Sequence, residues 1–186
     1  MKIILASKSP RRKELLKYIT TDFITVVSNI DEKYDTNLSP QDIVLFLSQS
    51  KAKVISKDYP NDIVIGCDTI VSLDNLILEK PVDKEDAFKM LKTLSNKTHQ
   101  VYTGVTIIYN NIIDSFYQKT EVTFYPLSDE EITKYINTKE PFDKAGAYGI
   151  QGFGSKFIKE IHGDYFTVVG LPIGELYQRL KKITGW

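Results

Sequence analysis

The chain has 186 residues, of which 42% are hydrophobic and 11% aromatic, a composition typical of one folded domain or one domain with an added lobe. Its 24 basic and 24 acidic residues balance, which excludes a global positive field for binding nucleic acid. One cysteine, Cys67, excludes an intramolecular disulfide and a cysteine-based zinc site. Neither a signal peptide nor a membrane span is recognised, so we expect a cytoplasmic protein with no membrane partner.

The start of the chain predicts a buried strand over Ile3-Ile4-Leu5-Ala6, followed at once by a helix from Ser9 to about Ile19. The Ser9 hydroxyl can cap this helix, and Pro10 suits its first position. Four cations crowd the helix N-terminus, where the helix dipole favours anions: Lys8, Arg11, Arg12 and Lys13. The cluster indicates a phosphate site, or alternatively a solvated basic turn.

A short strand around 23–27 is expected next, and Asp31 and Glu32 follow it. Ser39 then caps a second helix. The residues expected on its apolar face are Ile43, Phe46, Leu47 and Val54. The β-type run 62–73 predicts a central strand that is buried on both faces.

The middle of the chain predicts a third helix opened by residues 83–86, with Ala87, Met90, Leu91 and Leu94 on its buried face. Two β-rich runs, 101–109 and 112–125, are joined by a candidate hairpin turn at Asn110-Asn111. Ser128 begins a capping box for a fourth helix, which is expected to continue through Ile136.

The last part of the chain predicts a glycine-rich loop, a strand pair around 157–161 and 166–169, and a helix after Pro172. Strands and helices thus alternate around a central hairpin. This order predicts an α/β fold with a mixed, twisted sheet flanked by helices and bent around a cleft.

Asp68 is the most informative carboxylate because its neighbours in the central strand are apolar. A buried carboxylate is costly unless it is paired, hydrogen-bonded or bound to a cation. We interpret Asp68 as a metal ligand or general base, and the alternative is an aspartate satisfied by backbone amides. Together with Asp31 and Glu32, it offers hard oxygen ligands for Mg²⁺ or Mn²⁺.

Two lysines are candidates for a phosphate cradle, Lys51 on the second helix and Lys80 in the loop Glu79-Lys80-Pro81. Each lysine alone is more typical of a solvated surface charge, and the cradle is expected only from the two together. Four glycines between Gly146 and Gly154 indicate close backbone approach around Gln151. The Gln151 amide can read the edge of a base, or alternatively bond to backbone.

These motifs together resemble those of the Maf family of nucleoside triphosphate pyrophosphatases. The resemblance covers essentially the whole chain. It rests on the segments 5–16, Asp31-Glu32, Ser50-Lys51-Ala52, Gly66-Cys67-Asp68-Thr69, Glu79-Lys80-Pro81, 99–105, 144–152 and 169–172. Cys67 departs mildly from the small residue, such as alanine, that many members carry there.

The resemblance implies one domain over residues 1–186, with two lobes around a cleft and a fold related to the inosine triphosphate pyrophosphatases. It implies hydrolysis of a nucleoside triphosphate to the monophosphate and pyrophosphate with Mg²⁺ or Mn²⁺, a role in cleaning the nucleotide pool, and a homodimer. Asp68 matches the catalytic proton acceptor, and Glu32 with Asp68 is expected to bind the metal. The expected substrate-binding residues are Ser7, Ser9, Arg11, Arg12, Lys51, Thr69, Lys80 and Gln151.

Base preference is expected to depend on Arg11, Thr69 and Gln151, which resemble the subgroup that acts on dTTP and UTP. Two alternatives stay open. One is a pyrophosphatase for modified purine nucleotides such as 7-methyl-GTP, and the other is a nucleotide-binding regulator of cell division.

Overall fold

The computed structural model describes residues 1–110 and 112–185. The chain divides into two compact units, each described by itself below. Unit 1 comprises Met1–Asp68, Thr103–Gln118 and Gly170–Trp186, and unit 2 comprises Thr69–Tyr102 and Lys119–Val169. Within the described residues, no helix has the length and apolar character needed to cross a lipid bilayer.

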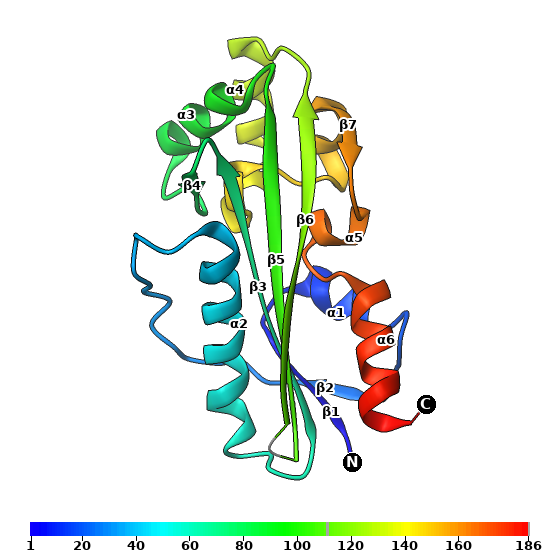
Figure 1. Cartoon of the computed structure of the whole chain (residues 1–186). Helices are drawn as coiled ribbons and strands as arrows, with labels where there is room; N and C mark the ends of the chain where they lie inside the picture. Colours follow the sequence, from blue (N-terminus) through cyan, green and yellow to red (C-terminus); the bar gives the residue numbers. More distant parts are fainter. Residues whose placement is uncertain (111, 186) are drawn as a thin grey trace. The chain divides into compact units, whose positions relative to one another are not determined.

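Strands and helices alternate along the chain, as Figure 1 shows. The strands are β1 (Ile3–Ala6), β2 (Phe23–Thr25), β3 (Ile63–Leu73), β4 (Leu76–Leu78), β5 (Thr98–Tyr109), β6 (Ile112–Phe124) and β7 (Ile158–His162). The α-helices are α1 (Pro10–Leu16), α2 (Pro40–Ser56), α3 (Lys84–Leu94), α4 (Asp129–Asn137), α5 (Tyr165–Val169) and α6 (Ile173–Thr184). Short 3₁₀ helices are η1 (Glu140–Asp143), η2 (Ala145–Ala147) and η3 (Gly152–Phe157).

The strands form one mixed seven-stranded sheet in the order β2-β1-β3-β5-β6-β7, with β4 paired to β3. In unit 1, β1 runs parallel to both of its neighbours. Its register with β3 pairs Ile3 with Ile63 and Ala6 with Gly66. Strand β1 ends at Ala6, whereas β3 continues through Cys67 and Asp68, so Ser7 lies at the end of β1 beside the middle of β3.

Helices cover both faces of the strands in unit 1, with α2 on one side and α6 on the other (Figure 1). The core beneath α2 consists of apolar side chains from β1, α2 and β3: Ile4, Ala6, Ala52, Ile55 and Val64. Strands β1 and β3 are buried almost throughout, as expected for parallel strands covered on both faces.

Unit 2 has a separate core in which α3 packs against α4. Asp83 caps α3, and Ser128 and Glu131 form a complete capping box at the start of α4. Aromatic rings fill the centre of this core, and two pairs meet edge-to-face, Phe124 with Tyr148 and Tyr135 with Phe157. The β6–β7 pairing is antiparallel and closes this unit's part of the sheet.

Most of the predicted elements are confirmed, and several boundaries or faces are wrong. Helix α1 ends at Leu16 rather than Ile19, and the segment predicted as a strand over 166–169 is helix α5. On α2, Phe46 and Val54 are exposed. Its buried face instead consists of Ile43, Val44, Leu47, Ser48, Lys51, Ala52 and Ile55.

Two further predictions concern the middle of the chain. Met90 on α3 is only partly buried, whereas Ala87, Leu91 and Leu94 form the buried face as predicted. Asn110 has a positive φ of 46°, as a tight turn between β5 and β6 requires. Asn111, the other residue of the predicted turn, lies outside the described residues.

Candidate active site

The alternation of side chains along β3 determines which residues of this strand face the candidate site. Residues two apart in a strand share a face, so Gly66 and Asp68 face the same side, and Cys67 faces the other. A Cβ on Gly66 would lie 2.2 Å from the Ser48 carbonyl oxygen and 2.8 Å from the Ala52 nitrogen. Gly66 therefore allows the backbone of α2 to approach the strand directly beside Asp68.

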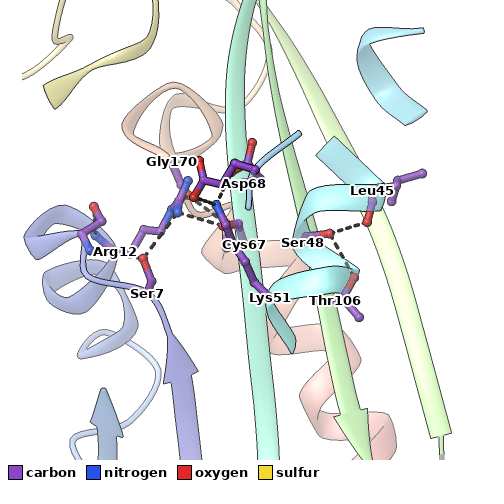
Figure 2. Close-up of polar contacts among 11 residues, drawn as sticks. Ser7, Arg12, Leu45, Ser48, Lys51, Cys67, Asp68, Thr106 and Gly170 are labelled. Atoms are coloured by element: carbon purple, nitrogen blue, oxygen red, sulfur yellow. Dashed lines mark hydrogen bonds and ion pairs between the residues drawn. The ribbon is translucent and has the colours of Figure 1, made fainter. Parts of the chain in front are cut away.

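This close approach places Lys51 against Asp68, as Figure 2 shows. Lys51 lies one residue before Ala52 on the buried face of α2, and its Nζ is 2.5 Å from Asp68 Oδ1. Both side chains are largely buried, with 8% of the Lys51 side chain and 11% of the Asp68 side chain exposed. Asp68 is therefore a buried carboxylate whose partner is a lysine rather than backbone amides, and its role as metal ligand or general base stays a prediction.

Glu32 contributes a second carboxylate to the same ammonium, with Lys51 Nζ 2.9 Å from Glu32 Oε1. Its side chain is 51% exposed, whereas Asp31 forms an ion pair with Lys33 on the surface. Two carboxylates that meet at one cation are a donor set suited to Mg²⁺ or Mn²⁺, which take the remaining ligands from water and substrate phosphates. Within residues 1–110 and 112–185, no group of three or more His, Cys, Asp or Glu side chains forms a metal cluster.

Arg12 connects three segments of unit 1 (Figure 2). Its Nε donates to the Gly170 carbonyl at 2.9 Å, and its Nη1 donates to the Cys67 carbonyl at 2.8 Å and to Ser7 Oγ at 3.4 Å. Ser9 caps α1 by accepting from the Arg12 backbone N–H. The Arg12 guanidinium therefore fixes the backbone beside Asp68.

The Cys67 thiol faces away from α2, and its Sγ lies 3.1 Å from the Gly170 carbonyl oxygen. Burial raises the pKa of this thiol above its usual range, although the Arg12 guanidinium opposes the effect. A protonated thiol donates to the Gly170 carbonyl, so the departure from the usual small residue has a structural use here.

The structure brings together the predicted residues Ser7, Ser9, Arg12, Glu32, Lys51 and Asp68 in unit 1. Arg11, also in unit 1, is half-buried in the first turn of α1. The remaining predicted residues lie in unit 2. Thr69 is half-buried on β3, Lys80 is exposed after β4, and Gln151 is exposed before η3.

The side chains that support the segment containing Gln151 are not identifiable from the sequence. Glu140 and Tyr135 form hydrogen bonds to the backbone at Gly149, Phe153 and Gly154. The glycines indicate a tight loop, but no motif identifies a carboxylate 13 and 14 residues before Phe153 and Gly154 as their hydrogen-bond acceptor. That acceptor is visible only in the folded unit.

Comparison with known proteins shows relatives along nearly the whole chain. A family model described as Maf-like protein matches residues 2–183. A protein named dTTP/UTP pyrophosphatase from Bacillus mycoides (strain KBAB4) is 52% identical over 181 residues, which are 97% of this chain and 95% of that relative. A Bacillus cereus (strain ATCC 14579) protein with the same name shows the same identity and coverage.

The fold has a solved counterpart at much lower sequence identity. The structure of the Staphylococcus aureus Ham1 protein aligns with a TM-score of 0.56 and 16% identity, covering 99% of this chain and all of that one. This likeness confirms the expected mixed α/β fold, related to that of the inosine triphosphate pyrophosphatases. The family match over residues 2–183 and the relatives that are about half identical in sequence show that this chain belongs to the Maf family.

Proposed function

We propose that the protein is a nucleoside triphosphate pyrophosphatase that hydrolyses dTTP and UTP to the monophosphate and pyrophosphate, as part of cleaning the nucleotide pool. The observation that carries this proposal is the buried Lys51–Asp68 pair, to which Glu32 adds a second carboxylate, in a chain whose relatives are named dTTP/UTP pyrophosphatase. Burying an ion pair costs desolvation free energy, and buried titratable groups with a charged partner are frequent at active sites. This pair lies beside Gly66, where α2 packs closely on β3.

In this proposal, Asp68 accepts the proton of the attacking water while its carboxylate orients that water toward phosphorus. Lys51 neutralises negative charge beside the reacting phosphate, and Arg12 holds the strand backbone at Cys67 so that Asp68 keeps its position. Ser7, Ser9 and Arg12 at the start of α1, with Lys80, bind the triphosphate oxygens. The bond between the α- and β-phosphates breaks, and pyrophosphate leaves.

The proposed cofactor is Mg²⁺ or Mn²⁺, with Asp68 and Glu32 as its protein ligands. When bound, such an ion supplies Lewis-acid stabilisation of the phosphate charge. The two carboxylates fit this role because they already converge on one cation, the Lys51 ammonium. Arg11, Thr69 and Gln151 determine base preference, with Arg11 and Gln151 meeting the pyrimidine carbonyls and N3–H.

A substrate panel tests the proposal. The purified protein is assayed for pyrophosphate release from the common triphosphates and 7-methyl-GTP, with Mg²⁺ and with Mn²⁺. We expect kcat/KM to be highest for dTTP and UTP. Faster hydrolysis of purine or methylated purine triphosphates would assign the chain to the modified-purine alternative, and nucleotide binding without turnover would favour the regulator.

The role of Asp68 is tested in the same assay. Asp68→Asn keeps the shape of the side chain and removes its basic oxygen, so we expect turnover of dTTP to fall by about 10²-fold or more while triphosphate binding is largely retained. Asp58→Asn, at an exposed aspartate of the same unit, is the control and is expected to match the wild type. Normal turnover by Asp68→Asn would remove Asp68 from catalysis.

A further inference from the structure

Glu140, the first residue of η1 in unit 2, uses both of its carboxylate oxygens as hydrogen-bond acceptors. Its Oε1 accepts from the Tyr135 hydroxyl at 2.9 Å and from the Gly154 backbone N–H at 3.1 Å. Its Oε2 accepts from the Phe153 backbone N–H at 2.8 Å. Both oxygens are therefore used, and two of the three donors belong to the segment that follows Gln151.

Tyr135 extends this contact to the residue on the other side of Gln151. Its hydroxyl accepts from the Gly149 backbone N–H at 3.2 Å while it donates to Glu140. The ring is 1% exposed and packs edge-to-face on Phe157, with the ring centroids 5.0 Å apart, so its hydroxyl has little freedom to move. Burial and the Glu140 carboxylate raise the pKa of Tyr135, which keeps this hydroxyl a donor.

The glycines of the segment show how closely it is bound to these two side chains. Gly152 has a φ of +81°, and a Cβ there would lie 2.6 Å from Glu140 Oε2. A Cβ on Gly154 would lie 2.8 Å from the Tyr135 hydroxyl. The backbone on both sides of Gln151 is thus held at contact distance by one carboxylate and one hydroxyl.

We propose that Glu140 and Tyr135 are positioning residues for base selection, because they fix the backbone that presents the exposed Gln151 side chain. The inference rests on the proposed function, in which Gln151 meets the carbonyl and N3–H of a uracil or thymine ring. An amide that reads a base edge discriminates only if its backbone is held in place, since a mobile glutamine can rotate to suit either hydrogen-bonding pattern.

Glu140→Gln is the sharpest variant because it preserves size and changes only the pattern of donors and acceptors. A glutamine has one carbonyl oxygen, so its NH₂ must face either the Phe153 N–H or the Tyr135 hydroxyl and Gly154 N–H, and at least one loop donor loses its acceptor. We expect the kcat/KM ratio of dTTP over dCTP to fall by about tenfold, with most of the loss in KM and with kcat for dTTP nearly retained.

Two further variants separate positioning from general destabilisation. Glu131→Gln removes a carboxylate that accepts the Ser128 backbone N–H at 2.8 Å, also in unit 2, and it is expected to leave the dTTP/dCTP ratio unchanged. Tyr135→Phe retains the ring and removes the hydroxyl, and it is expected to lower the ratio in the same direction as Glu140→Gln.

Hydrogen exchange gives a second readout that does not depend on turnover. In Glu140→Gln, the amides of Phe153 and Gly154 are expected to exchange about tenfold faster than in the wild type, and in Glu131→Gln at the wild-type rate. A wild-type dTTP/dCTP ratio in Glu140→Gln, together with a lowered ratio in Gln151→Ala, would overturn this inference alone. A wild-type ratio in Gln151→Ala would overturn it together with the proposed role of Gln151.

Discussion

Lys51 is the residue on which unit 1 concentrates its charge. A buried lysine is tolerated because Asp68 and Glu32 both contact its ammonium, and the three groups together carry one net negative charge. The remaining negative charge on the two carboxylates can bind a second cation, such as a divalent metal ion. The Lys51 ammonium therefore has two roles: it neutralises buried carboxylates in the folded protein, and in the proposed reaction it neutralises phosphate charge.

Removing Lys51 is therefore expected to cost stability as well as activity. Lys51→Met leaves the Asp68 carboxylate buried without its cation, and we expect the free energy of unfolding to fall by about 3 kcal/mol. The double variant Lys51→Met with Asp68→Asn is expected to be more stable than Lys51→Met alone, because a neutral amide is less costly to bury. Urea unfolding near pH 7 measures all three proteins.

The exposed Lys53 on the same helix is the control, and Lys53→Met is expected to unfold like the wild type. Losses that simply add in the double variant would contradict the coupling between Lys51 and Asp68.

Among the elements, helix α2 has the strictest packing requirement. It lies on two glycines of neighbouring strands, since a Cβ on Gly66 would meet Ser48 O and a Cβ on Gly104 would lie 2.4 Å from Val44 O. The Ser48 hydroxyl also bonds to Thr106 Oγ1 at 3.0 Å, which ties the helix to β5. These contacts fix the distance between the helix and the sheet, and so the distance from Lys51 to Asp68.

Gly66→Ala is expected to push α2 outward. We expect a loss of about 2 kcal/mol in unfolding free energy from overpacking, and a fall in turnover of about 10²-fold because Lys51 moves away from Asp68. Gly174→Ala is the matched control, since a Cβ there meets nothing within 4 Å and the residue lies in helix α6. Unchanged turnover by Gly66→Ala would show that the reaction tolerates a displaced helix.

The elements also show what the sequence could predict. Caps such as Ser9, Ser39 and Ser128 act locally, so helix starts were predictable. The buried face of α2 was not predictable from hydrophobicity, which places a lysine such as Lys51 in solvent. Only the ion pair with Asp68 explains why Lys51 is buried. The sequence predicts a strand where helix α5 forms, because its β-branched residues, Thr167 to Val169, favour strands when tertiary contacts are ignored.

Some features of the candidate site are also predictable from the sequence, and others are not. Asp68 was predictable because a lone carboxylate in an apolar strand is visible in the sequence. The Lys51–Asp68 pairing, the Arg12 bonds to two carbonyls and the Glu140 anchor depend on residues far apart in the chain, which only the fold brings together.

At the scale of the whole molecule, stability near neutral pH depends on a histidine in the core of unit 2. His99 is fully buried between Phe124 and Tyr148, and its Nε2 lies 2.8 Å from the Tyr148 hydroxyl. Its Nδ1 is buried without a hydrogen-bond partner among the described residues. Burial lowers the pKa of His99 from 6.5 to about 4, because loss of solvent around the ring disfavours the charged imidazolium.

The sign of the resulting pH dependence follows from the two pKa values. Above about pH 6.5, His99 is neutral in both states, and its contribution to stability is complete. Between about pH 6.5 and 4, the unfolded chain binds a proton that the folded protein does not, so the free energy of unfolding falls as the pH falls. Between pH 7.5 and pH 5, we expect this residue to account for a loss of about 2 kcal/mol.

Urea unfolding of the wild type and of His99→Asn at these two pH values isolates that contribution, since asparagine does not titrate. The variant is expected to be less stable at pH 7.5, because its packing and its bond to Tyr148 are poorer, but to lose about 2 kcal/mol less than the wild type on going to pH 5. His162→Gln, at the exposed histidine on β7, is expected to keep the wild-type pH dependence. An equal drop in the wild type and His99→Asn would assign the acid sensitivity to other groups that titrate on unfolding, since in that case His99 would bind its proton equally in both states.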